Sequence, residues 1–146
     1  MSWFSSIFRG QSRPPLQHSL FGELRYSRTD GWINDHFELW GFKGIQLLID
    51  AGADGPSLQQ ENAFRAFVDQ RETLLPRCID EVDRVRKGLE VEPSTFVITG
   101  LTIPSLTTGK NPFLWTLWFD LKGDDHFMYG VQTDDAWVTL IGFADD

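Results

Sequence analysis

The sequence predicts an α+β domain, in which a mostly antiparallel sheet carries a pair of helices on one face. Within residues 18–146, apolar and polar residues alternate as in strands toward both ends, and helical spacing lies between these two regions. Single strands and helices do not alternate along the chain, which argues against a parallel α/β fold. The expected order of elements is therefore β-β-β-α-α-β-β-β-β. The 146 residues suit one domain, which buries roughly two-thirds of the surface that the unfolded chain exposes.

Residues 1–17 are expected to form an arm, and residues 18–146 the domain. The stretch RGQSRPPLQ has adjacent prolines and no apolar period, which is typical of an extended segment. Four apolar residues before it have the spacing of one face of a short helix: Trp3, Phe4, Ile7 and Phe8. Such a helix could dock on its own domain, on a partner or on a membrane surface.

Three strands of a meander are expected next. The first covers Leu20–Ser27, and the Asp-Gly pair after it is a hairpin turn signal. The stretches WINDHFEL and IQLLID then predict the second and third strands, with a turn in the GFKG segment between them. If the chain turns near Lys43, His36 and Asp50 become cross-strand neighbours.

Two helices follow the meander. Ser57 is the expected N-cap of the first, with Gln60 as its capping-box partner. Pro76 is expected in the first turn of the second helix. Proline has no backbone N–H, and the N–H groups of the first turn have no helical acceptor. Gly88 and Pro93 mark its end. The apolar stripes of the two helices are Phe64, Phe67 and Val68, and then Leu75, Cys78, Ile79, Val82, Val85 and Leu89.

Four more strands complete the predicted domain, from the stretches TFVITGLTI, FLWTLWFDL, FMYGVQT and AWVTLIGF. In the second of these, alternation places Trp115, Leu117 and Phe119 on one face and Thr116, Trp118 and Asp120 on the other. Trp118 is therefore expected either under a loop or the N-terminal arm, or partly exposed as a binding hot spot.

His36 and Asp50 are the first candidate pair for chemistry. They could form a general-base dyad or a polar contact on the outer side of the hairpin. The sequence contains no Gly-x-Ser-x-Gly nucleophile motif and no phosphate-binding loop. Its one cysteine, Cys78, lies on the apolar face of a predicted helix and is expected to be a buried thiol. We therefore predict no catalytic residue and no cofactor.

The DLKGDDH segment is the second candidate. Its Asp120, Asp124, Asp125 and His126 could hold a divalent cation, because carboxylates and imidazole are common metal ligands. Aspartates beside glycine are also ordinary turn residues, and the spacing matches no calcium loop. The sequence thus predicts no metal ligand here.

The charge of the chain excludes some partners and favours others. The net charge is −8, and phosphate binding requires lysine and arginine, so we expect no nucleic-acid binding. An acidic body could steer a basic protein partner, or serve solubility alone. The single cysteine excludes an internal disulfide and favours a reducing cytoplasm. No apolar run approaches the ~20 residues that span a bilayer.

Two stretches resemble small bacterial domains of unknown function. FDLKGDDHFMYGVQTDDAWVTLIG resembles their C-terminal signature, and FELWGFKGIQLLIDAGADGPSLQQENAFRAF is similar to their earlier strand–loop–helix segment. Together these stretches cover about half of the chain. Relatives of these families often occur near polymorphic toxin genes. The resemblance therefore implies an immunity-type or other protein-binding role, and it implies no catalytic residues.

The sequence thus favours a non-enzymatic, cytoplasmic, protein-binding domain that neutralises a toxin. The alternative is a small hydrolase-like enzyme, or a small-ligand or metal-binding domain, that uses His36 with Asp50 or Asp124 and Asp125 with His126. The predicted partner surface consists of one aromatic residue and its acidic and imidazole neighbours: Trp118, Asp120, Asp124, Asp125, His126, Asp134 and Asp135.

Overall fold

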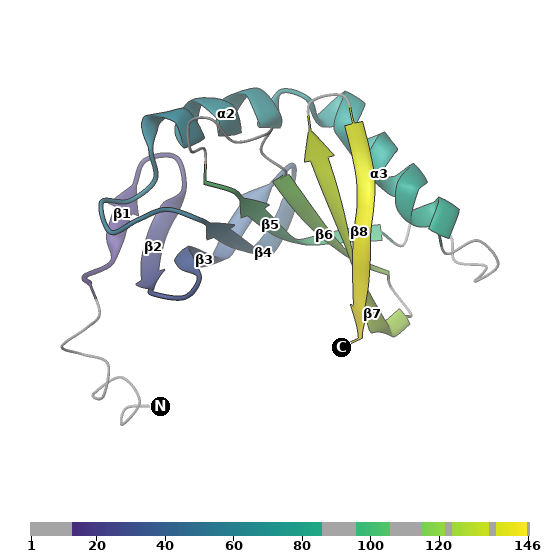
Figure 1. Cartoon of the computed structure of the whole chain (residues 1–146), viewed down its shortest axis with the longest axis horizontal. Helices are drawn as coiled ribbons and strands as arrows, with labels where there is room; N and C mark the ends of the chain where they lie inside the picture. Colours follow the sequence, from purple (N-terminus) through teal and green to yellow (C-terminus); the bar gives the residue numbers. More distant parts are fainter. Residues whose placement is uncertain (1–12, 86–95, 106–114, 122–123, 135–136, 146) are drawn as a thin grey trace.

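The computed structural model describes residues 13–85, 96–105, 115–121, 124–134 and 137–145 (Figure 1). Side chains are placed in residues 13–84, 96–105, 115–120 and 129–132. The elements follow one another as β1 (Leu16–His18), β2 (Gly22–Ser27), β3 (Gly31–Leu39), β4 (Phe42–Ile49), α2 (Leu58–Val68), α3 (Arg71–Val85), β5 (Phe96–Ile103), β6 (Trp115–Leu121), β7 (Asp124–Asp134) and β8 (Trp137–Asp145).

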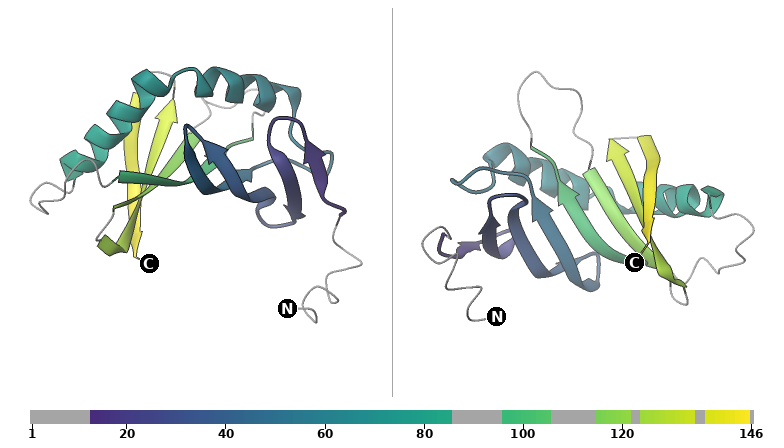
Figure 2. Two further views of the ribbon diagram at one scale, coloured as in Figure 1. Left: turned by 180° about the vertical axis from the view of Figure 1, so that it is seen from behind. Right: turned by 60° about the horizontal axis from the view of Figure 1, so that its bottom comes forward.

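The described strands form one sheet, in which they lie side by side in chain order from β1 to β8. Every described neighbouring pair is antiparallel except β4 and β5, which are parallel. A parallel pair needs a long crossover connection, and the segment with α2 and α3 provides it. Both helices cover the same face of the sheet (Figures 1 and 2). The α+β class and the mostly antiparallel sheet are therefore confirmed.

The predicted order of elements is wrong at its start, because four strands precede the helices. The additional strand β1 pairs with β2, with Leu16 opposite Leu24. The turn between them is held by His18, whose Nδ1 accepts hydrogen bonds from the backbone N–H groups of Leu20 and Phe21 at 3.0 and 3.2 Å. The predicted arm thus ends inside a strand, and its proposed helix at residues 3–8 lies outside the described residues.

Helix α2 begins as the sequence predicts. The Gln60 N–H donates to Ser57 Oγ at 3.1 Å, and the Ser57 N–H donates to Gln60 Oε1 at 3.0 Å, which completes the capping box. Gln60 is 1% exposed, and its Nε2 also donates to the carbonyl oxygens of Asp50 and Pro104, each at 2.9 Å. One buried amide therefore ties the ends of the parallel strands β4 and β5 to the start of α2.

The position predicted for Pro76 is wrong. Helix α3 begins at Arg71, so Pro76 lies inside it rather than in its first turn. The helix starts this early because the Leu74 N–H donates to the Gln70 carbonyl at 2.8 Å, directly after α2 ends. Pro76 is exposed, so water can bind the carbonyl group of Glu72 that proline leaves without its helical donor. The end predicted at Gly88 and Pro93 lies outside the described residues.

The core lies between the helices and the sheet. Phe67 of α2 stacks between Trp40 and Trp115, with ring-centroid distances of 5.4 and 4.6 Å. Helix α3 packs against β7 and β8, and its Cys78 is fully buried, as predicted. The strands contribute a continuous apolar layer: Ile45, Leu47, Ile49, Ile98, Leu101, Ile103, Trp115, Leu117 and Phe119.

Candidate functional site

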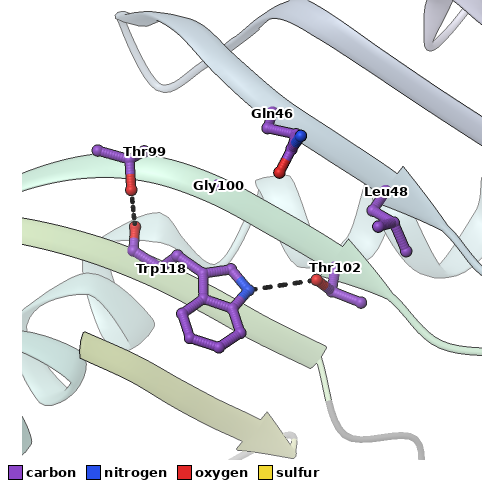
Figure 3. Close-up of a pocket in the computed structure, with 6 residues that line it drawn as sticks. All are labelled: Gln46, Leu48, Thr99, Gly100, Thr102 and Trp118. Carbon is purple, nitrogen blue, oxygen red and sulfur yellow. Dashed lines mark hydrogen bonds between the residues drawn. The ribbon is translucent and has the colours of Figure 1, made fainter. Parts of the chain in front are cut away.

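The candidate site is a hollow on the face of the sheet opposite the helices, which we call the open face (Figure 3). The hollow has a volume of about 250 Å³. Its lining comes from three neighbouring strands and contains no charged side chain: Gln46, Leu48, Thr99, Gly100, Thr102 and Trp118. Because side chains alternate along a strand, these residues face away from the apolar layer under the helices.

Trp118 forms one wall of the hollow and lies along the sheet rather than standing away from it. In the strand register Trp118 is opposite Gly100 of β5 on one side and Gly130 of β7 on the other. A Cβ atom at Gly130 would lie 2.6 Å from the six-membered ring of the indole, and one at Gly100 would lie 3.2 Å from its Cδ1. The two glycines therefore provide the space in which the indole lies. The glycine row continues into β8, where Gly142 is opposite Gly130.

Two hydrogen bonds hold Trp118 in place. Its Nε1–H donates to Thr102 Oγ1 at 3.3 Å, and the Thr99 hydroxyl donates to the Trp118 carbonyl at 3.4 Å (Figure 3). Thr99 lies at a register shift between Ile98 and Gly100, which is a β-bulge. The bulge places two successive residues of β5, Thr99 and Gly100, in the lining of the same hollow.

A chain of polar side chains extends from the hollow toward the edge of the sheet. Gln46 Nε2 donates to Asp35 Oδ1 at 3.3 Å, and Asp35 Oδ2 accepts from Arg25 Nη2. The Arg25 and Asp35 side chains are 63% and 41% exposed, so this ion pair is weak in energy. The ion pair fixes the Asp35 carboxylate, and this carboxylate orients the Gln46 amide by accepting from its Nε2.

One residue of the predicted partner surface, Trp118, lines this hollow. Trp118 is partly buried on the opposite face from Trp115, as alternation predicts. Asp120 follows it on the same face of β6, two residues further on. The other lining residues were not predicted as site residues. The glycines at positions 100 and 130 inside predicted strands were the signal for them, because a strand glycine often marks a close approach.

Four of the remaining predicted residues lie in β7. Asp124, Asp125 and His126 begin this strand instead of forming a turn, and Asp134 ends it. The ten residue steps of β7 separate the two ends by roughly 30 Å. Asp135 and the side chains of the other four lie outside the described part of the chain.

The predicted neighbourhood of His36 and Asp50 is wrong. The hairpin turns at Trp40 and Gly41, which have φ angles of 53° and 89°, and not at Lys43. Trp32 is opposite Ile49 in this register, so Asp50 lies beyond Trp32 and roughly 15 Å along the hairpin from His36. Both side chains are exposed, and the Asp50 backbone N–H donates to the Ile103 carbonyl at 2.9 Å. The structure therefore provides no dyad here.

The early turn has a tertiary cause. Trp40 adopts a left-handed conformation that non-glycine residues rarely occupy. Its Nε1–H donates to the Val68 carbonyl at 3.0 Å, and its ring stacks on Phe67. These contacts with α2 stabilise the turn, and local sequence does not show them.

Within the described side chains, no group of three histidine, cysteine, aspartate or glutamate residues lies close enough to hold a metal ion. Neither α2 nor α3, the helices of the described residues, is long and apolar enough to cross a membrane. Burial raises the pKa of the Cys78 thiol to about 12, so this group is not an active nucleophile near neutral pH.

Comparison of the chain with protein-family models, with curated proteins and with solved structures finds no match.

Proposed function

We propose that the chain is a non-enzymatic protein-binding domain whose partner docks on the open face around Trp118. The observation that supports this proposal most strongly is the partly buried indole that lines the hollow. The hollow lies on the open face, and Figure 2 shows α2 and α3 on the other face of the sheet. Tryptophan is among the residues most enriched at the energetic centres of protein interfaces.

The form of the open face suits a large, flat contact. The glycine row at Gly100, Gly130 and Gly142 removes side chains on both sides of Trp118, so a partner can approach the sheet closely there. The net charge of −8 favours a basic partner, mainly by raising the rate of association. Asp120, on the same face as Trp118, and the acidic residues of β7 are the candidate groups for this steering.

We further propose that the partner is a basic toxin and that the domain neutralises it in a bacterial cytoplasm. This part of the proposal is supported by the likeness of two stretches of the sequence to small bacterial domains associated with toxin genes, and by the acidic charge. No residue of this chain is assigned a catalytic role.

A second candidate function is the binding of a small molecule in the hollow. The presence of a hollow of about 250 Å³ with an aromatic wall and polar side chains favours it. This volume is slightly below the roughly 300–1,000 Å³ that is usual for pockets that bury drug-sized ligands. One partner side chain therefore suits the hollow better than a whole ligand.

Capture of partners from native lysate, with three forms of the chain as bait, tests the proposal. The forms are wild type, Trp118→Ala and the control Leu58→Ala. Leu58 is an apolar side chain 67% exposed at the start of α2, away from the open face. A partner retained by wild type and Leu58→Ala is then purified, and its affinity is measured for all three forms.

Truncation of a hot-spot tryptophan costs about 2 kcal/mol or more of binding free energy. We therefore expect Trp118→Ala to weaken the affinity for the purified partner roughly 30-fold or more. Leu58→Ala should bind as wild type does. Equal affinities for Trp118→Ala and wild type would place the interface elsewhere and refute the proposal.

A further inference from the structure

We infer that the hollow beside Trp118 receives an arginine side chain of the partner. This inference rests on the proposed function, because it names the group that the partner inserts. Three features of the hollow support it: a planar aromatic wall, neutral hydrogen-bond acceptors, and negative charge outside its lining.

The aromatic wall suits a planar cation. A guanidinium group stacks on the face of an aromatic ring and is attracted by the ring's electron distribution, most strongly in the case of tryptophan. The indole of Trp118 is held along the sheet by Thr102 and by the space over Gly100 and Gly130. It therefore presents a fixed surface and loses little conformational freedom on binding. Leu48, on the other side of the hollow, can contact the apolar stem of the arginine.

The polar groups of the lining are mostly acceptors that a guanidinium can use. Gln46 Nε2 donates to Asp35, and no donor of the described residues is bonded to Gln46 Oε1. Figure 3 shows this amide oxygen pointing into the hollow, between Trp118 and Leu48. The Thr102 hydroxyl accepts from the indole and retains a second lone pair. Arginine has five N–H donors in a flat fork, whereas lysine has a compact, strongly hydrated ammonium group.

The charges around the hollow favour a cation without burying an ion pair. The lining itself is neutral, while carboxylates lie just outside it: Asp35, bonded to Gln46, and Asp120, two residues beyond Trp118 on the same face. Arg25 offsets the charge of Asp35, so the net charge of −8 of the whole chain provides most of the attraction. A guanidinium in this position keeps part of its hydration, which avoids the desolvation cost of a fully buried ion pair.

Nuclear magnetic resonance of the full chain, labelled with ¹⁵N at its tryptophan indoles, tests the inference. The Trp118 N–H signal is identified as the signal that disappears in Trp118→Phe. Three probes are titrated separately at matched ionic strength: N-acetyl-arginine methylamide, N-acetyl-lysine methylamide and methyl glucoside. The control variant Leu58→Ala should respond as wild type does, and Gln46→Leu removes an acceptor from the hollow.

We expect the arginine probe to shift the Trp118 signal saturably and to bind at least about threefold more tightly than the lysine probe. Gln46→Leu should weaken binding of the arginine probe and leave the melting temperature close to that of wild type. The glucoside should leave the Trp118 signal unchanged.

Equal binding of the arginine and lysine probes would show that charge alone acts, and would overturn the inference. A stronger response to the glucoside would overturn it in favour of a small-molecule site. The absence of any shift would also overturn it. None of these outcomes alters the proposed function, which fails only if Trp118→Ala leaves the affinity of the purified partner unchanged.

Discussion

Trp115 and Trp118 lie three residues apart on β6, and they show how differently the two faces of the sheet are built. Trp115 is 5% exposed under the helices and stacks on Phe67 at 4.6 Å with an interplanar angle of 8°. Trp118 contacts glycine positions and threonine hydroxyls on the open face, and no described aromatic ring stacks on it. Residue type alone therefore does not separate a tryptophan of the core from a tryptophan of the open face. Its cross-strand neighbours do.

The covered face and the open face also differ in their packing. Under the helices, Leu47, Leu101 and Leu117 are completely buried on three neighbouring strands. On the open face, Gln46 is exposed, and Leu48 and Thr102 are only partly buried. The covered face therefore provides most of the free energy of folding, and the open face can change in sequence at lower cost.

Leu47→Pro is expected to have the largest effect on the folding of the domain. Leu47 lies in β4 between β3 and β5, opposite Asn34 and Leu101. Proline would remove a backbone donor in the middle of the sheet and delete a buried side chain of the covered face. We expect the domain not to fold, as measured by circular dichroism. Soluble protein with an unchanged spectrum would show that β4 is not a central strand.

The second effect is the contrast between Trp115→Ala and Trp118→Ala. Removal of a buried aromatic side chain costs about 3–5 kcal/mol, so Trp115→Ala should lower the free energy of unfolding by that amount. Trp118→Ala should cost about 1 kcal/mol, because its side chain loses mainly surface contacts and one hydrogen bond. Urea denaturation of both variants measures the difference. Equal losses would mean that Trp118 is part of the core and would abolish the distinction between the two faces.

The third effect concerns the glycine beneath the indole. A Cβ atom at Gly130 would lie 2.6 Å from Trp118, so Gly130→Ala must displace the ring, at a cost of about 1–3 kcal/mol in unfolding free energy. In a Trp118→Ala background the same change should cost much less, because the clash is gone. A double-mutant cycle by urea denaturation gives this coupling. Additive losses would contradict the placement of the indole over Gly130.

The effect that is smallest at neutral pH is the pH dependence that Cys78 of α3 adds, because it develops only above pH 9. Burial raises the pKa of its thiol from 9.0 to about 12 in the folded chain. Above pH 9 the unfolded chain loses this proton while the folded chain keeps it, so stability falls as pH rises toward 12. The slope is about 1.4 kcal/mol per pH unit.

We expect the unfolding free energy of wild type to fall more steeply than that of Cys78→Ala between pH 9 and pH 10.5. Urea denaturation at several pH values measures both slopes, and other titrating groups cancel in the comparison. Parallel slopes would mean that the thiol is accessible to water in the folded chain.

The sequence predicted the features that depend on local patterns. Alternation assigned Trp115 and Trp118 to opposite faces, the Ser57–Gln60 spacing identified the start of α2, and helical spacing predicted the burial of Cys78. Each of these features requires only residues that are close together in the chain.

The features that the sequence did not predict depend on distant contacts. The position of the β3–β4 turn follows from the packing of Trp40 on Val68 and Phe67, more than 25 residues away. The hollow follows from the register that brings Gly100 and Gly130 to the two sides of Trp118. Alternation gives the face of a residue, but it does not give the residue opposite to it on the next strand.

One measurement tests the division of the sheet into a core face and a binding face most directly. It is the titration of the chain, labelled with ¹⁵N at its tryptophan indoles, with the purified partner. We predict that the Trp118 N–H signal changes on binding, while the Trp115 signal, assigned through Trp115→Phe, keeps its position. Binding that leaves the Trp118 signal in place would show that the partner uses another surface and would contradict the account.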